Sequence, residues 1–148
     1  MANCNIILNM ATKKRFEIIE HTADIGLIAY GDDLAGAFAS AGLGMFSIVT
    51  DLHKIKNTSS ITVTLSESGY EDLLFEWLNR LIYHFDVEGW IFKEFLPLEF
   101  TPYRLKFVCF GEKLNPARHR VKTGIKSATY HLLEVDESNS RVKVIFDI

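Results

Sequence analysis

The stretch IGLIAYGDDLAGAFASAGLGMFSIV at residues 25–49 contains, in order, the patterns of a strand, a turn and a helix. Residues 25–31 predict a β-strand, and Asp32 and Asp33 supply a helix N-cap with negative charge at the first turn. The apolar residues that follow recur at spacings of three and four, which predicts one apolar helix face. That face contains Leu34, Ala37, Phe38, Ala41, Met45, Ile48 and Val49.

Three glycines, at positions 36, 42 and 44, interrupt this predicted helix. Each glycine lowers helix stability by about 1 kcal/mol relative to alanine. A helix with three glycines must regain this stability through its packing against other elements. We therefore predict that other elements pack closely against it.

Strand patterns surround a second predicted helix, which begins after Ser68-Gly69 and ends at Gly89. Its wide apolar stripe predicts a buried helix face. The stripe contains Leu73, Leu74, Trp77, Leu78, Leu81, Ile82 and Phe85. The other predicted strands cover residues 15–20, 61–65, 90–100, 103–110, 119–126, 129–135 and 141–148, with a turn at 111–117.

This order of elements predicts an α+β fold, with two helices packed on mostly antiparallel sheet. The strand-rich segments around each helix suit two interleaved modules. We expect residues 15–148 to form a single domain, because 148 residues can bury one sizeable core. Residues 1–14 are expected to be a flexible leader, within which Met10 is an alternative start.

Composition excludes several classes of protein. The chain is 48% hydrophobic and 24% charged, which is typical of globular domains, and its net charge of −3 argues against a general polyanion binder. Cys4 and Cys109 are far apart and form no metal-binding motif, which favours a reducing, cytoplasmic compartment. No apolar run reaches the roughly 20 residues that a membrane span needs.

Charge is nevertheless unevenly distributed along the chain. Residues 113–133 contain five basic residues and no Asp or Glu. Such a block is typical either of a patch that faces phosphate or an acidic partner, or of a solvated strand face. The basic residues are Lys113, Arg118, Arg120, Lys122 and Lys126.

The chain lacks a phosphate-binding loop, an H-E-x-x-H zinc pair and a G-x-S-x-G nucleophile elbow. Its C-terminus is more informative, because Asp147 is followed directly by Ile148. If Ile148 is anchored in the core, its terminal carboxylate lies near the Asp147 side chain, and two carboxylates this close favour a cation such as Ca²⁺ or Mg²⁺. A frayed end with two solvated charges is the alternative. Taken alone, the HTAD turn at residues 21–24 is ordinary turn chemistry.

Several of these segments together resemble the archease family, over residues 15–148. The resemblance rests on their content and on their order along the chain. The matching segments are HTADIG at 21–26, AYG at 29–31, LGMF at 43–46, DLLFEWLNRLIYHFD at 72–86, RHRVKTGIKSATYHLLEV at 118–135 and VIFDI at 144–148.

This resemblance implies a protein cofactor, not an enzyme, that activates an RtcB-type RNA ligase in tRNA splicing or RNA repair. Such a protein promotes guanylylation of the ligase histidine, supports multiple turnover and broadens the use of nucleoside triphosphates. The resemblance also implies a strand-helix-strand-strand module with a second module inserted into it. No catalytic residue is expected in this chain.

The resemblance implies a divalent-metal site, with calcium as the first expectation and magnesium or manganese as alternatives. Its ligands map onto Asp24, Asp147 and the terminal carboxylate of Ile148, so Asp24 is expected to lie beside the C-terminus. Lys126 is a further candidate functional residue, and His21, Arg118 and Arg120 are candidate partner contacts. The basic block is expected to contact the ligase in preference to RNA, with any contact to tRNA being indirect.

Two other functions remain open at this stage. One is a stand-alone metal-dependent phosphoester hydrolase, with His21 or His131 as general base beside the carboxylates. The other is a chaperone-like or RNA-binding module that uses the basic segment, whose affinity for RNA would depend steeply on salt.

Overall fold

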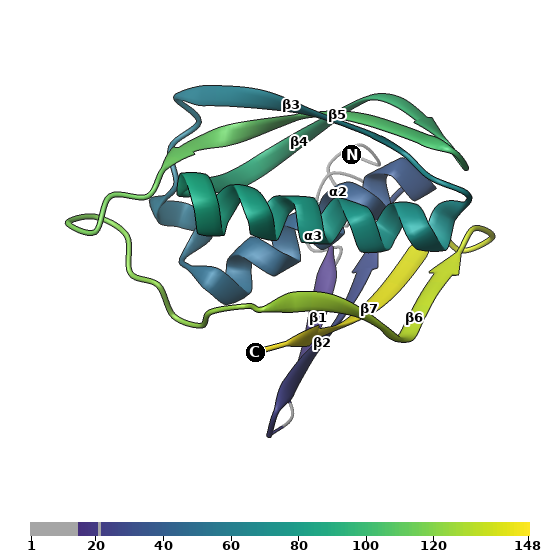
Figure 1. The fold of residues 1–148 in the computed structure, drawn as a ribbon, viewed down its shortest axis with the longest axis horizontal. Coiled ribbons are helices and arrows are strands. Elements are labelled where there is room, and N and C mark those ends of the chain that lie inside the picture. The colour runs from purple at the N-terminus through teal and green to yellow at the C-terminus, as the bar shows by residue number, and fades with distance from the viewer. Residues whose placement is uncertain (1–14, 21) are drawn as a thin grey trace, which may run out of the picture.

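Two helices lie between two antiparallel sheets in the computed structural model, which describes residues 15–20 and 22–148. Figure 1 shows the three layers, with one sheet above the helices and the other below. The helices are α2 (Leu34–Val49) and α3 (Tyr70–Glu88), and a short 3₁₀ helix, η1, spans Leu52–Lys54. The predicted leader at residues 1–14 lies outside the described residues.

The strands form two sheets of different size. The first sheet has the order β1-β2-β7-β6, with β1 at Phe16–Glu20, β2 at Asp24–Tyr30, β7 at Arg141–Asp147 and β6 at Ser127–Asp136. The second sheet has the order β3-β5-β4, with β3 at Ser59–Ser66, β5 at Arg104–Lys113 and β4 at Trp90–Thr101. All strand pairs are antiparallel.

This topology contains two interleaved modules of the same kind. The elements β2, α2, β6 and β7 form one strand-helix-strand-strand unit, extended by β1. The elements β3, α3, β4 and β5 form the second, and they are inserted in the chain between α2 and β6. The predicted α+β fold, including its inserted module, is confirmed. Its consequence is that both ends of the domain meet in one sheet.

Helix α2 begins and packs as the sequence predicts. The Asp33 carboxylate accepts a hydrogen bond from the Gly36 N–H at 2.7 Å, which caps the helix. The helix contacts β2 on one side and β4 on the other. A Cβ atom at Gly44 would lie 2.6 Å from Leu27 Cδ1, and one at Gly42 would lie 3.0 Å from the Phe95 ring. The glycines therefore allow both sheets to approach the helix closely, as predicted.

Helix α3 is joined to α2 through a buried tryptophan. The Trp77 side chain is fully buried, and its Nε1–H donates to the Phe38 carbonyl of α2 at 2.9 Å. Its ring also lies edge-on against Phe107 of β5, with 4.9 Å between ring centroids. The helix ends at Gly89, whose φ of 76° is the left-handed conformation that glycine adopts readily. None of the helices in the described residues is long and apolar enough to cross a membrane.

The predicted strand at residues 119–126 is wrong. Residues 114–126 form an irregular connection from β5 to β6, and β5 itself extends through Lys113 into the predicted turn at 111–117. The connection is tied down at separate points, because the Lys122 N–H donates to the Val49 carbonyl and the Lys126 N–H to the Asp147 carbonyl. His119 and Ile125 are buried, but Val121, which would share their face in a strand, is 45% exposed, so burial does not follow a strand pattern here.

Candidate metal centre

Strands β2 and β7 bring Asp24 and Asp147 together. The strand register places Asp24 directly opposite Asp147, at one end of the four-stranded sheet. Leu27 of β2 and Val144 of β7 lie three residues away from Asp24 and Asp147, on the opposite face of the sheet, and both are buried against the helices. Because side chains alternate along a strand, Asp24 and Asp147 both lie on the face turned away from the helices. The expected proximity of Asp24 to the C-terminal residues is therefore present in the structure.

Asp24 has an oxygen atom that the described residues leave without a partner. Its Oδ1 atom is buried, and no donor in residues 15–20 or 22–148 makes a hydrogen bond to it. A buried carboxylate oxygen without a partner costs free energy, because it has lost its hydration without replacement. Such an oxygen suits a site for a cation, which would replace the missing hydrogen bonds.

The end of the chain is held next to this pair. The Ile148 side chain packs against the hydrophobic core, and the Asp147 carbonyl accepts the Lys126 N–H at 2.8 Å. The terminal carboxylate therefore belongs to a residue, Ile148, whose side chain is anchored in the core and whose neighbour, Asp147, is hydrogen-bonded to Lys126. Within the described residues, no three side chains of His, Cys, Asp or Glu converge on a metal position. Among the described residues, a third ligand beside Asp24 and Asp147 would come from the terminal carboxylate or a backbone carbonyl.

A pocket lies over Asp24 and includes residues of β6. Its lining residues are Glu20, Thr22, Ala23, Asp24, His131, Leu132 and Ile145. The pairing of β6 with β7 is interrupted between Thr129 and Glu134, and Leu132 has a φ of 55°. A leucine rarely adopts this left-handed conformation. Residues 129–134 follow an ordinary strand pattern, so sequence reasoning did not anticipate this irregularity.

The other candidate residues occupy different environments. Lys126 is exposed, and its backbone joins the connection before β6 to the C-terminal strand. Arg120 is also exposed, and its carbonyl accepts a hydrogen bond from the Thr50 hydroxyl at 2.7 Å. His21 lies outside the described residues. The structure thus brings together Asp24, Asp147 and Ile148, while the basic candidates lie along the β5–β6 connection.

Arg118 is the exposed member of a hydrogen-bonded cluster that sequence reasoning missed, in which Glu112 and His119 are buried. Its Nη2 atom donates to Glu112 Oε1, while Glu112 Oε2 accepts the Lys56 N–H at 2.7 Å. His119 Nε2 lies 3.0 Å from the same carboxylate oxygen. Burial of the Glu112 carboxylate tends to raise its pKa, but these hydrogen bonds and the charge of Arg118 outweigh burial and lower the pKa to about 2. Glu112 is therefore a satisfied structural anion.

The protonation of His119 follows from its neighbours. Its Nδ1 atom accepts the Asn115 N–H at 2.8 Å, so the ring proton resides on Nε2. That Nε2–H points to Glu112 and to the Lys54 carbonyl at 3.2 Å. His119 therefore joins the β5–β6 connection to η1, and it does not line the pocket over Asp24.

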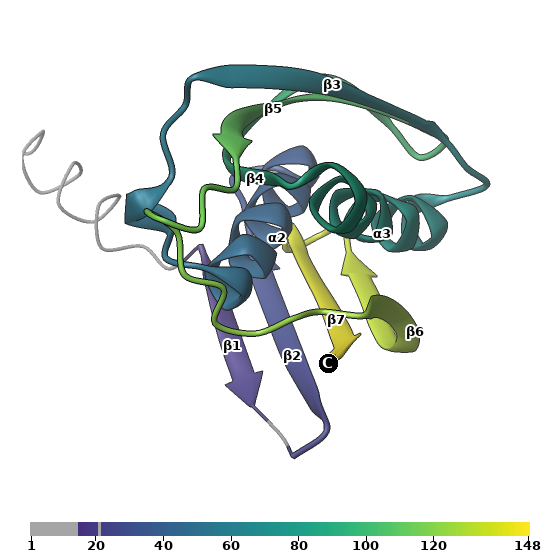
Figure 2. The same cartoon turned by 60° about the vertical axis from the view of Figure 1, so that its left-hand side comes forward.

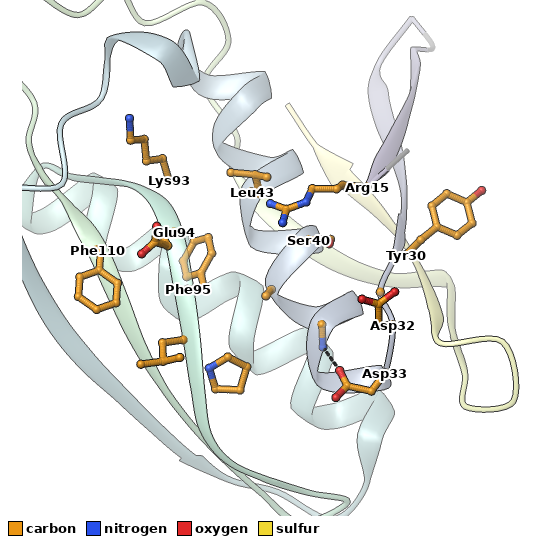
Figure 3. Close-up of a pocket in the computed structure, with 15 residues that line it drawn as sticks. Arg15, Tyr30, Asp32, Asp33, Ser40, Leu43, Lys93, Glu94, Phe95 and Phe110 are labelled. Carbon is orange, nitrogen blue, oxygen red and sulfur yellow. Dashed lines mark hydrogen bonds between the residues drawn. The ribbon is translucent and has the colours of Figure 1, made fainter. Parts of the chain in front are cut away.

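A larger cavity lies elsewhere, between the N-terminal half of α2 and strand β4. It has a volume of about 820 Å³ and is lined by residues that include Arg15, Lys93, Glu94 and Phe95. Figure 3 shows Arg15 reaching over α2 towards Leu43, opposite Phe95. Neither Asp24 nor Asp147 lines this cavity, and the sequence pattern indicated no chemistry there.

The fold and the carboxylate end define a class: small α+β proteins with two interleaved modules and an acidic tip at the junction of β2 with the last strand. The model of the Archease protein family (MTH1598/TM1083) matches residues 16–148. The chain therefore belongs to the archease family.

Individual relatives agree with this assignment. The chain is 36% identical to the protein archease of Sulfolobus acidocaldarius over 126 residues, which cover 84% of this chain and 91% of the relative. It is 35% identical to the protein archease of Methanosarcina mazei over 141 residues, which cover 91% and 97% of the two chains.

Solved structures show the same fold. The solution structure of protein 1598 from Methanobacterium thermoautotrophicum has a TM-score of 0.74 and 26% identity, and covers 92% of this chain and all of that one. The crystal structure of the Thermotoga maritima archease, described as a possible chaperone, has a TM-score of 0.57 and 24% identity, with coverage of 89% and 96%. The second comparison supports the fold alone.

Proposed function

We propose that this protein activates an RtcB-type RNA ligase in tRNA splicing or RNA repair. It would act in the cytoplasm as a protein cofactor, promote guanylylation of the ligase histidine and release the ligase for further turnovers. It would also broaden the nucleoside triphosphates that the ligase accepts. Membership of the archease family supports this proposal. The observation that carries it is the Asp24 oxygen opposite Asp147, to which the described residues donate no hydrogen bond.

The residues present fit a divalent cation. Asp24, Asp147 and the terminal carboxylate of Ile148 would hold it, and oxygen ligands of this kind favour calcium, with magnesium or manganese as alternatives. When bound, the ion supplies positive charge that can attract the phosphates of a nucleotide or the acidic metal site of a partner. The chain's own contribution is to fix the two carboxylates by strand pairing, so that they need no rearrangement to bind.

The position of this centre suits a partner that completes the chemistry. The carboxylates lie at one end of the sheet, and in both views of the fold the C-terminus lies beside the ends of β2 and β6 (Figures 1 and 2). The adjoining pocket is formed by short side chains of the β1–β2 turn together with His131 and Leu132. A projecting tip of this kind can enter a cleft of the ligase. We therefore assign this protein a positioning role and leave the covalent step to the ligase.

The proposal is tested by RNA ligation with limiting ligase and excess broken RNA, with and without this protein. We expect more than one ligation per ligase molecule only when the protein is present, together with faster formation of the guanylylated ligase. Asp24→Asn should abolish both effects. Asp86→Asn is a matched control, because Asp86 is an exposed carboxylate on α3, away from the C-terminal strand. Unchanged ligase turnover with the wild-type protein would overturn the proposal.

A further inference from the structure

The fold joins the basic β5–β6 connection to a second basic segment from another part of the sequence. The Thr50 hydroxyl donates to the Arg120 carbonyl, and the Lys122 N–H donates to the Val49 carbonyl at 2.7 Å. Six exposed basic side chains of the two segments form what we call the basic arc. It consists of His53, Lys54, Lys56, Arg120, Lys122 and Lys126. Figure 2 shows the connection passing η1 and continuing to β6, near the C-terminus.

The acidic residues in and beside these two segments are already paired with basic side chains. Asp51 pairs with Lys122 at 3.5 Å, and Glu112 is paired with Arg118. In the part of the chain that the structure describes, no ion pair is formed by the other lysines and arginine of the arc. These residues are Lys54, Lys56, Arg120 and Lys126. Gathering like charges opposes folding, and an anionic ligand would offset this cost.

The arc is held in place by buried polar groups. The Glu112 carboxylate accepts the Lys56 N–H, and His119 bridges that carboxylate and the Lys54 carbonyl. Glu112 and His119 are only 8% and 4% exposed. A long connection without regular secondary structure is thus fixed at its middle, which presents its cations without a large ordering cost on binding.

The composition of the arc favours a polyanion over a protein surface. Protein interfaces contain an apolar, often aromatic, centre. Among the described residues of segments 49–58 and 113–126, Val121 is the one large hydrophobic side chain that is exposed. A row of lysines and arginines without an apolar centre is typical of contacts to a nucleic-acid backbone. The net charge of −3 for the whole chain conceals this local surface.

We infer that the basic arc binds the phosphate backbone of RNA. One end of the arc lies beside the C-terminal strand, because the Lys126 N–H donates to the Asp147 carbonyl. The absence of exposed aromatic rings among the described residues of these segments means that binding depends on charge, with little preference for base sequence. This inference goes beyond the proposed function and does not depend on it, because RNA binding is measurable without a ligase.

The test measures the binding of a fluorescently labelled single-stranded RNA of about 20 nucleotides to the protein alone, by fluorescence anisotropy at several salt concentrations. Four cations that each neutralise one phosphate predict a slope of about −3 for log affinity against log salt. The double variant Lys54→Glu and Arg120→Glu should lower affinity at least about tenfold and reduce the magnitude of the slope by about half. Circular dichroism should show that this variant remains folded.

A matched control reverses one lysine and one arginine elsewhere. Arg80 is exposed on α3 and Lys106 lies near the start of β5, so the double variant Arg80→Glu and Lys106→Glu has the same net charge but an intact arc. Its affinity should stay within about threefold of wild type. Weak binding without salt dependence, or an equal loss in the control, would overturn the inference. Wild-type RNA affinity combined with lost ligase stimulation in the arc variant would overturn it as well, since the arc would then contact the ligase.

Discussion

Two partly buried carboxylates in this protein have opposite surroundings. Glu112 accepts hydrogen bonds from Lys56, Arg118 and His119, and its pKa is lowered to about 2. Asp24 has a buried oxygen for which the described residues provide no donor. The first arrangement is complete within the described residues, whereas the second leaves one carboxylate oxygen without a donor from them. Comparing them separates a carboxylate that stabilises the fold from one that is available for binding.

The largest expected effect is on ligand binding at Asp24. Asp24→Asn removes one negative charge from the pair with Asp147, so calcium affinity should fall about a hundredfold or more. Isothermal titration calorimetry on the metal-free protein measures this change directly. Calcium should also raise the melting temperature of wild type and of Asp86→Asn, because a ligand that binds the folded state stabilises it. Equal calcium affinity in Asp24→Asn and wild type would remove the assigned difference between the two carboxylates.

The opposite result is expected at Glu112, where stability changes and calcium binding does not. Glu112→Ala leaves Arg118, His119 and the Lys56 N–H without their acceptor. We expect a loss of about 2 kcal/mol in the free energy of unfolding, since Arg118 is partly exposed and can be rehydrated. Urea denaturation in the presence of a chelator measures it. A loss below about 0.5 kcal/mol would show that the cluster contributes little to stability.

Acid should remove the contribution of Glu112 to stability. Its folded-state pKa of about 2 lies below the ordinary value of 4.5, so the ionised carboxylate stabilises the folded protein. This contribution is fully present above about pH 4.5 and is lost as the pH falls towards 2. The difference in unfolding free energy between wild type and Glu112→Gln should therefore shrink between pH 5 and pH 3. A difference that stays constant over this range would contradict the proposed hydrogen bonding.

The smallest effect is expected at Lys126, which touches the carboxylate end through its backbone. Lys126→Ala keeps the N–H that donates to Asp147, so the unfolding free energy should change by less than about 0.5 kcal/mol. Calcium affinity should also stay within about threefold of wild type. Stimulation of the ligase should nevertheless decrease, if the exposed ammonium group contacts the partner or its RNA. Calorimetry and the ligation assay together separate these outcomes, and unchanged stimulation would exclude Lys126 from the functional surface.

Much of the fold and part of the site were predictable from the sequence. The cap at Asp33 and the close packing at Gly42 and Gly44 follow from local preferences and from apolar spacing, and the structure confirms them. The expected nearness of Asp24 to the C-terminus came from family resemblance, and strand pairing places Asp24 opposite Asp147. The assignment of these residues as metal ligands stays a prediction.

The predicted strand at 119–126 failed for a physical reason. Its polar residues alternate as they would in a strand, but their hydrogen-bond partners lie far away in the sequence. His119 meets the Lys54 carbonyl, and Thr50 meets the Arg120 carbonyl, across separations of 65 and 70 residues. Local preference cannot anticipate such pairing, since it arises only when the two modules pack together.

The sequence by itself determined the two helices, most of the strands and the acidic ends of β2 and β7, because capping and periodic burial are local properties of the chain. Only the tertiary structure decided that Glu112 is fully hydrogen-bonded, while the described residues leave one Asp24 oxygen without a donor. It also decided that η1 and the β5–β6 connection form one basic surface. Both outcomes depend on contacts between distant segments, and the free energy of a charge is set by the groups that folding brings around it.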